Sequence, residues 1–374
     1  MDEIGTEAQK NVWKASIPLL IHLHDSEITS LPPPNPVVIL APRFGYLPLI
    51  APQLKACFSG TLPPGDDTIW FEYKGMPLKW YIPTGVLFDL LCAEPESPWK
   101  LTVHFRGYPS HLLTPCEGED AVKWNFINSL KEAVYIMNGN CKNIMNMSQS
   151  DQTALWRSVL DAGNLESFLK VTSKLKLGVV EDKYIHHPLF KPPSSAGTTD
   201  NTDLVKTGRI PVRLYVRTVL EEFHDLENVP EIDSWDRVSC INRPIEFDKD
   251  EGTYMTLGDA MKTLLPEYFT ERPEHNEKPK PTEDEIIEEP SVEPADTESS
   301  GESTTTVTDR PEPIQISTNL KLGLIRIHRC EPPLNVPISW VVNNLMFPDH
   351  FLHICVYLIH RKSSFRPLLS ASTR

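Results

Sequence analysis

The 374-residue sequence has no apolar run long enough to cross a bilayer, and its first residues are acidic where a signal peptide would be basic. Its seven cysteines are scattered, odd in number, and never form a C-x-x-C pair. This usage favours free thiols in a reducing compartment over a disulfide framework or a zinc site. We therefore expect a soluble, cytoplasmic protein.

Basic residues are also scarce, with 36 Lys and Arg against 51 Asp and Glu. The net charge of −15 argues against nucleic-acid binding and would confine any membrane contact to a local basic patch. The charge is uneven, because residues 271–313 hold fourteen acidic and four basic side chains, a net of −10. That stretch is also poor in apolar residues and rich in Pro, Ser and Thr. We predict a disordered acidic insertion over residues 270–316.

Motifs of catalysis are missing as well: no nucleotide-binding glycine loop, G-x-S-x-G elbow, H-E-x-x-H pair or EF-hand spacing occurs. His22 and His24 share one face of a predicted strand, but two ligands without a third are typical of ordinary histidines. Cys116 with His111 and Asp120 could form a thiol-hydrolase triad. Their closeness within a Pro-rich loop makes this the less favoured alternative. We expect no catalytic site, no metal and no cofactor.

The most informative stretch is residues 69–91, which is rich in aromatic side chains. Its first part alternates between two faces, with Phe71 and Tyr73 on the same one, as in a strand. Gly75 then marks a hairpin turn, and Pro83 can begin a helix because a first-turn residue needs no N–H partner. The stretch therefore predicts strand, tight turn, strand and short helix.

The elements around this stretch occur twice in the same order. In the first half we expect a helix over residues 3–14, strands at 16–24, 37–40 and 99–105, and a helix at 46–58. In the second half we expect strands at 209–217, 322–328 and 351–357, a helix at 256–266 and a short helix ending at Leu345. This is the order of a β-grasp, ubiquitin-like domain, so the sequence predicts two of them.

Between the two halves, residues 118–190 are predicted to be rich in helices. The first runs from about Asp120 to Asn138, where Gly139 supplies a stop, and others begin near Ser150 and Asn164. The expected fold class is α+β: two ubiquitin-like β-grasp domains (16–107 and 208–358) flank a helix-rich domain (118–190). A short N-terminal helix (1–15), a linker (191–207) and a basic tail (359–374) complete the predicted organisation.

Several motifs resemble the autophagy protein 5 family, in a plant-like form with an acidic insertion. Residues 69–91 give the strongest match. It is supported by Val12-Trp13 with Ile17-Pro18, Pro42-Arg43 with Tyr46-Leu47, Pro98-Trp99 with Val103-His104-Phe105, and Pro348-Asp349 with Phe351-Leu352-His353-Ile354. These motifs span nearly the whole chain. The resemblance implies two ubiquitin-like domains flanking a helix-rich domain, in agreement with the repeat.

The resemblance also implies that Lys131, in the motif Leu130-Lys131-Glu132-Ala133, forms an isopeptide bond with the C-terminal glycine of autophagy-related protein 12. Separate activating and conjugating enzymes would deliver this modifier as a thioester. Lys131 lies at the edge of an apolar helical stripe expected to bury Val122, Phe126, Leu130, Val134 and Met137, with Ile127 and Tyr135 one turn away on either side. A lysine at a helix edge is ordinarily a surface group, so only the resemblance selects Lys131 over Lys123 and Lys142.

By the same resemblance, the conjugate binds the N-terminal helix of autophagy protein 16 against both ubiquitin-like domains and the helical segment. The assembly would act like an E3: it would recruit the conjugating enzyme that attaches a modifier of the autophagy-related protein 8 type to phosphatidylethanolamine at phagophore membranes. Trp13 is a candidate for partner binding, although core packing is equally open. Lys170 and Lys174 could contact the membrane, but such clusters are usually solvated faces. An unmodified tandem ubiquitin-like adaptor is the remaining alternative.

Overall fold

The computed structural model describes residues 6–65, 68–92, 96–160, 164–175, 177, 208–220, 232–246, 255–269 and 320–360. The predicted linker at 191–207, the acidic insertion at 270–316 and the tail beyond residue 360 lie outside the described residues. The chain divides into two compact units, and every described residue belongs to the unit formed by residues 1–269 and 319–374.

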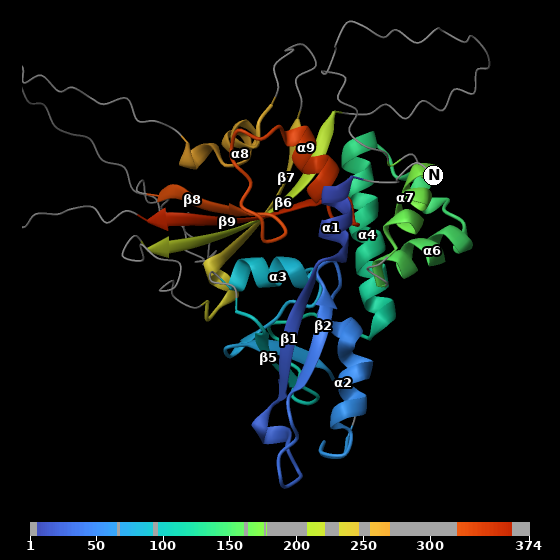
Figure 1. Cartoon of the computed structure of the whole chain (residues 1–374), viewed down its shortest axis with the longest axis vertical. Coiled ribbons are helices and arrows are strands. Elements are labelled where there is room, and N and C mark those ends of the chain that lie inside the picture. Colours follow the sequence, from blue (N-terminus) through green and yellow to red (C-terminus); the bar gives the residue numbers. More distant parts are fainter. Residues whose placement is uncertain are drawn as a thin grey trace, which may run out of the picture. The chain divides into compact units, whose positions relative to one another are not determined.

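The first half of the chain forms a five-stranded sheet with the strand order β2-β1-β5-β3-β4 (Figure 1). Its strands are β1 (Ser16–Leu23), β2 (Val37–Pro42), β3 (Trp70–Tyr73), β4 (Met76–Pro77) and β5 (Trp99–His104). β1 and β5 are parallel neighbours in the centre, while β1–β2, β3–β5 and β3–β4 are antiparallel. The predicted alternation along β1 is confirmed, since Ile17, Leu19, Ile21 and Leu23 are all buried.

The second half forms a four-stranded sheet with the order β7-β6-β9-β8. Its strands are β6 (Arg209–Leu220), β7 (Val238–Glu246), β8 (Leu320–Arg326) and β9 (Leu352–His360). β6 and β9 are parallel in the centre, and both outer pairs are antiparallel. This is the arrangement of β2-β1-β5-β3 in the first sheet, so the predicted internal repeat of a β-grasp is confirmed. The strand β7 was not located from the sequence.

Each sheet has two helices of its own, and a further helix precedes the first sheet. They are α1 (Glu7–Lys14), α2 (Ala51–Phe58), α3 (Thr84–Leu91), α8 (Leu257–Leu264) and α9 (Ile338–Leu345). The helix predicted from residue 46 begins as the 3₁₀ turn η2 (Leu47–Ile50), and α-helix starts only at Ala51. Pro48 and Pro52 explain the change, because neither has an N–H for a continuous α-helical ladder. Short 3₁₀ turns also occur at η1 (Asp25–Glu27), η4 (Trp235–Arg237) and η5 (Pro266–Tyr268).

The middle of the chain is helical, as predicted. It contains α4 (Glu119–Asn138), α5 (Lys142–Met145), α6 (Gln149–Leu160) and α7 (Leu165–Lys174), of which the short α5 was not predicted. α4 ends where expected, because Gly139 adopts a φ of 71° and its N–H donates to the carbonyl of Tyr135 at 2.8 Å. Asn164 caps α7 by accepting the N–H of Ser167.

The inner face of α4 packs into the core with two differences from expectation. Val122, Phe126, Leu130 and Val134 are buried as predicted. Met137, expected in the core, is only partly buried, and Ile127, expected at the edge of the stripe, is 1% exposed. The stripe is therefore rotated toward Ile127.

The central strand β6 of the second sheet is covered on both faces. Ile210, Val212 and Leu214 of β6 point into a cluster with α8 and α9. Tyr215 and Val219 of the same strand belong to the larger cluster that contains the first sheet, α4 and α7. A strand covered on both sides can place polar side chains in protected positions between the layers.

Candidate functional site

Lys131, the predicted acceptor, lies in the second half of α4 and is partly exposed. Among the described residues its amine has no hydrogen-bond or ion-pair partner. Trp124 and Tyr135 lie on the same helical stripe, seven residues before and four after it, and are 53% and 61% exposed. The amine is thus open to a reactant from solvent, between two exposed aromatic rings.

Exposure alone does not distinguish Lys131 from the neighbouring lysines. Lys123 is partly exposed on the same helix, and Lys142 is exposed at the start of α5. Lys131 differs from both lysines in its surroundings, because the next residue, Glu132, forms an ion pair with the second sheet. The selection of Lys131 as the acceptor stays a prediction.

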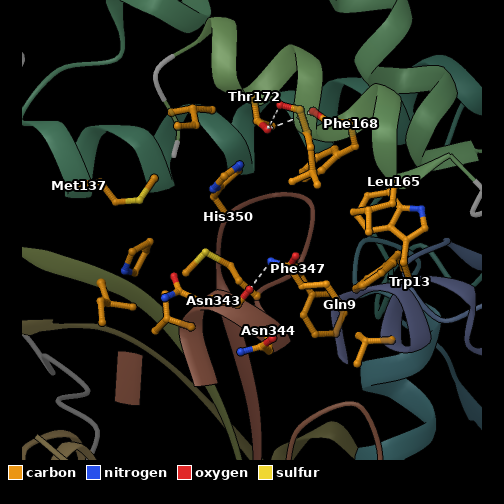
Figure 2. A pocket seen from close by; sticks show the side chains of 18 of the residues that line it. Gln9, Trp13, Met137, Leu165, Phe168, Thr172, Asn343, Asn344, Phe347 and His350 are labelled. Atoms are coloured by element: carbon orange, nitrogen blue, oxygen red, sulfur yellow. Dashed lines mark hydrogen bonds between the residues drawn. The ribbon is translucent and has the colours of Figure 1, made fainter. Parts of the chain in front are cut away.

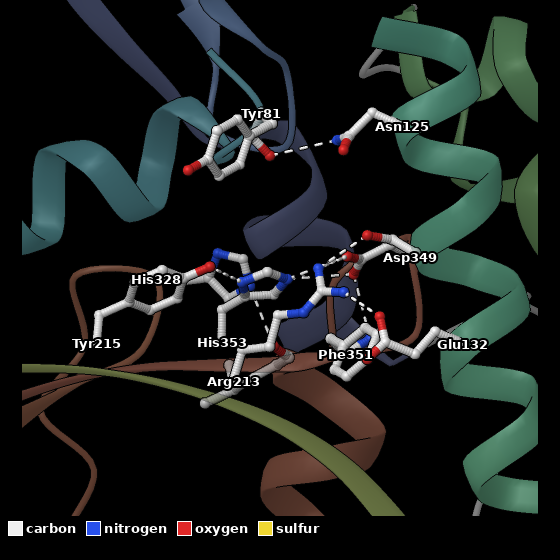
Figure 3. A network of polar contacts seen from close by, with 11 residues as sticks. Tyr81, Asn125, Glu132, Arg213, Tyr215, His328, Asp349, Phe351 and His353 are labelled. Atoms are coloured by element: carbon white, nitrogen blue, oxygen red, sulfur yellow. Dashed lines mark hydrogen bonds and ion pairs between the residues drawn. The ribbon is translucent and has the colours of Figure 1, made fainter. Parts of the chain in front are cut away.

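Arg213 of β6 makes that contact (Figure 3). Its Nη2 donates to Oε2 of Glu132 at 2.8 Å, and its Nη1 donates to Oγ of Ser129 at 2.8 Å. The same Nη1 lies 3.5 Å from Oδ2 of Asp349. The guanidinium carbon lies 3.7 Å from the centroid of the Phe351 ring, a cation–π contact. One arginine thereby joins α4 to the second β-grasp sheet.

The network continues into the sheet through Asp349. Its carboxylate lies 3.1 Å from Nε2 of His353, whose Nδ1 in turn meets the hydroxyl of Tyr215 at 3.0 Å. Burial alone would raise the pKa of Asp349, but the attraction of His353 and Arg213 and the N–H of Phe351 together lower it below its ordinary value. Asp349 is therefore a buried carboxylate held ionised by its partners.

A cavity of about 110 Å³ lies where α1, α4, α7 and the α9–β9 segment meet (Figure 2). Its walls are mostly apolar; the labelled lining residues are Gln9, Trp13, Met137, Leu165, Phe168, Thr172, Asn343, Asn344, Phe347 and His350. Burial lowers the pKa of His350 to about 4, so this ring is neutral at pH 7. The cavity is thus built by the N-terminal helix, the helical region and the second β-grasp.

Trp13 is 5% exposed and lines this cavity. Its ring centroid lies 5.0 Å from that of Phe44 and 4.7 Å from that of Phe168. The start of α1 is fixed nearby, since the hydroxyl of Thr6 donates to the side chain of Asn344 at 2.6 Å and Gln9 donates to the carbonyl of Asn343. Trp13 is therefore packed in the core and also forms part of the cavity wall. Its role in partner binding stays a prediction.

The two lysines predicted to contact a membrane are both exposed on α7. Nζ of Lys174 is 2.8 Å from Oδ1 of Asp151, an ion pair between α7 and α6, whereas Lys170 has no such pair among the described residues. The pair leaves less positive charge available to an anionic surface than the sequence suggests. Within the described part of the chain, no helix is long and apolar enough to cross a membrane.

The alternative thiol site at Cys116 gains no support from its surroundings. Its thiol points to the carbonyl of Gly118 at 3.8 Å, and within the described residues no hydrogen bond links it to His111 or Asp120. Burial raises the pKa of Cys116, the opposite of what a nucleophilic thiolate needs. His24 stacks on His104, with 4.3 Å between the ring centroids, and no metal-binding group of three ligands occurs in the described segments.

Comparison with known proteins follows the same division of the chain. The family model "Autophagy protein ATG5, UblA domain" matches residues 12–105, the alpha-helical bundle region matches 119–178, and the UblB domain matches 209–356. The chain belongs to the autophagy protein 5 family. The two β-grasp sheets are therefore the UblA and UblB domains of this family, and α4 to α7 are its helical bundle region.

Curated relatives agree with this family over almost their full length. Autophagy protein 5 of Arabidopsis thaliana is 52% identical over 94% of this chain and 98% of its own. Autophagy protein 5 of Oryza sativa subsp. indica is 48% identical over 96% of this chain and 97% of its own. The crystal structure of Kluyveromyces marxianus Atg5 has a TM-score of 0.56 at 17% identity, covering 95% of this chain and 99% of that one. That structure supports the fold alone.

The polar network around Arg213 was not predicted from the sequence. Arg213 and Arg217 alternate with apolar residues along β6, a pattern that normally indicates a solvent-facing side of a strand. One motif that resembles the family, Pro348-Asp349 with Phe351-Leu352-His353-Ile354, contains three members of this network, namely Asp349, Phe351 and His353. The contacts that link these residues to Arg213 could not be predicted without the structure.

Proposed function

We propose that this chain is the non-catalytic acceptor of autophagy-related protein 12 and that Lys131 is the modified residue. The observation that supports the proposal is the amine of Lys131, which is partly exposed and has no partner among the described residues. The family supports a role in autophagy, and the descriptions of the matched models name no catalytic domain.

The chemistry needs only a nucleophile from this chain. The neutral amine of Lys131 attacks the thioester carbonyl at the C-terminal glycine of the modifier, and an N–C bond forms as the C–S bond breaks. The thiolate of the conjugating enzyme leaves, and the proton lost from the amine nitrogen passes to water or to this thiolate. Activation of the modifier is the work of the separate enzymes. The absence of a catalytic motif in the sequence is compatible with this role.

The cavity between α1, α7 and α9 is our proposed binding region for the N-terminal helix of autophagy protein 16. Mostly apolar walls with a few amides, such as Gln9 and Asn343, suit the apolar side chains of an amphipathic helix lying in a groove. In this proposal Trp13 contributes to binding as part of the cavity wall rather than from an exposed surface.

The resulting complex would act like an E3 for a modifier of the autophagy-related protein 8 type. It would recruit the lipid-conjugating enzyme and be held peripherally at phagophore membranes, with Lys170 as the candidate membrane contact. The family membership supports autophagosome formation as the setting. The competing function, an unmodified tandem ubiquitin-like adaptor, would need the same domains but no acceptor lysine.

The test is Lys131→Arg in cells that lack the native protein, followed by blotting for a band larger by the mass of the modifier. Arginine keeps the charge but cannot form the isopeptide bond. We expect the larger band to disappear and the matched variant Lys123→Arg to keep it. A larger band that persists in Lys131→Arg would contradict the site, and its absence from the wild type would favour the unmodified adaptor.

A further inference from the structure

The guanidinium of Arg213 contacts α4 at two places on one face of the helix. Ser129 and Glu132 are three residues apart and so lie almost one above the other. Each contact is 2.8 Å long, and each uses a different nitrogen of the fork. The buried face of α4 already packs into the core, and two contacts along one further face add a polar restraint on the height of the helix and on its rotation about its own axis.

Arg213 itself is held from the opposite side by the second β-grasp. Phe351 lies under its guanidinium, and the buried carboxylate of Asp349 lies 3.5 Å from Nη1. Asp349 is in turn fixed by His353, whose side chain is 0% exposed. The side chain of Arg213 is only 18% exposed. The guanidinium of Arg213 is therefore held in one position between the sheet and the helix.

The rotation that Arg213 helps to fix decides where Lys131 points. Successive residues of an α-helix are about 100° apart around its axis, so fixing Glu132 fixes the direction of Lys131. The ion pair also engages the carboxylate next in sequence to Lys131.

We propose that Arg213 is a positioning residue for conjugation: through Ser129 and Glu132 it holds α4 in the rotation that presents the amine of Lys131. This inference rests on the proposed function of Lys131. It extends that function by naming the part of the UblB domain on which the reaction depends. Arg213 does not touch the reacting atoms, and it acts only through the helix.

The ion pair between Arg213 and Glu132 is exposed to solvent, so its effect on conjugation can be tested without unfolding the chain. Glu132 is 47% exposed, and an ion pair so open to solvent contributes little to global stability. Alanine is also the best helix former, so replacing Ser129 and Glu132 by alanine does not weaken α4 itself. The double variant Ser129→Ala/Glu132→Ala removes both contacts and leaves Arg213 and Asp349 in place.

The experiment is single-turnover transfer of the modifier from its charged conjugating enzyme to the full chain, measured over a range of chain concentrations. We expect the double variant to lower the maximal rate about five- to tenfold, because a misplaced nucleophile reacts slowly. The concentration giving half the maximal rate should stay within about twofold. Glu132→Gln still accepts a hydrogen bond from Arg213, so its rate should fall between wild type and Glu132→Ala.

Two controls make the outcome decisive. Arg237→Ala removes an exposed ion pair with Asp233 and should leave the rate unchanged. Thermal unfolding of every variant should stay within about 2 °C of wild type, which excludes a loss of folded protein. A double variant that transfers the modifier at the wild-type rate would overturn the positioning role. Lys131→Arg tests the acceptor separately: if it still conjugates, the proposed function itself has failed.

Discussion

The indole ring of Trp13 lies 4.7 Å from the phenyl ring of Phe168, and this contact joins the N-terminal helix α1 to helix α7. The indole also contacts Phe44, which follows β2 of the first sheet, with 5.0 Å between the ring centroids. One side chain therefore holds together three segments that are far apart in the sequence. The family motif Val12-Trp13 marks a residue that is part of the core.

Replacing Trp13 should therefore destabilise the chain in the absence of any partner. Loss of a buried tryptophan leaves a cavity, so Trp13→Ala is expected to lower the free energy of unfolding by about 3 to 5 kcal/mol. Trp13→Phe should cost less, because a ring remains against Phe168. Urea unfolding monitored by circular dichroism measures both. Trp124→Ala, at a residue 53% exposed, is the control and should change the value by less than about 0.5 kcal/mol.

A second prediction concerns the buried ion pair between Arg43 and Asp89. The two side chains are 4% and 3% exposed, and Asp89 also accepts the N–H of Arg329 at 2.8 Å. Arg43→Ala would leave a buried carboxylate without its cation and should cost about 3 to 5 kcal/mol at pH 7.5. The exposed pair of Arg237 with Asp233 gives the contrast, with an expected cost below about 1 kcal/mol for Arg237→Ala.

The pH dependence of Arg43→Ala provides an internal check. Burial already raises the pKa of Asp89 above its ordinary value even with Arg43 present. Removing the cation raises that pKa further, so the carboxyl takes up a proton more readily on folding. The destabilisation should therefore be smaller at pH 5 than at pH 7.5. An equal cost at both values would show that Asp89 does not carry the effect.

Much of the fold could be predicted because its signals are local. The alternation of buried residues along β1 and the stop of α4 at Gly139 each depend on neighbouring residues in the sequence. The repeat of these signals then indicated a second β-grasp. The strand β7 was missed because only Val238 and Ile245 of its nine residues are buried. It contains Asn242 and Pro244, and both residue types are depleted in strands.

The surroundings of Lys131 could not be predicted for a different reason. The contact between Glu132 and Arg213 joins residues 81 positions apart. Its geometry depends on how the helical bundle packs against the UblB sheet, which no local pattern encodes. The charged face of β6 resembles a solvent-exposed one until another layer is known to cover it. Family resemblance could select Lys131, but only the packed structure links it to Arg213.

A third prediction uses His328, which is buried at 6% exposure and stacks on Phe347 with 4.1 Å between the ring centroids. Its Nε2 lies 3.1 Å from the carbonyl of Leu345 and acts as a donor to it. Burial, with a smaller effect of Arg43, lowers the pKa of His328 well below its ordinary value. The folded chain thus binds fewer protons here than the unfolded chain.

His328 makes the stability of the folded chain depend on pH. The contribution of His328 is complete above the unfolded pKa of about 6.5 and declines as the pH falls toward the lower folded value. Between pH 6.5 and 5.0 this single group should lower the free energy of unfolding with a slope of at most about 1.4 kcal/mol per pH unit. His328→Asn keeps a donor and tolerates the φ of 51° at this position. Its unfolding curves at several pH values should lack this part of the acid dependence, and an unchanged slope would contradict the assignment.

The last prediction tests the hairpin in the stretch that identified the family. Lys74 and Gly75 connect β3 to β4 with φ values of 51° and 84°, as in the two-residue turns that match the twist of a hairpin. A Cβ atom added at Gly75 would meet nothing within 4 Å, so its only penalty is the left-handed backbone. We expect Gly75→Ala to lower the free energy of unfolding by about 1 kcal/mol. Gly60→Ala, which has equal space but no positive φ, should be neutral or slightly stabilising, and equal losses in the two variants would show that the turn conformation is not what requires glycine.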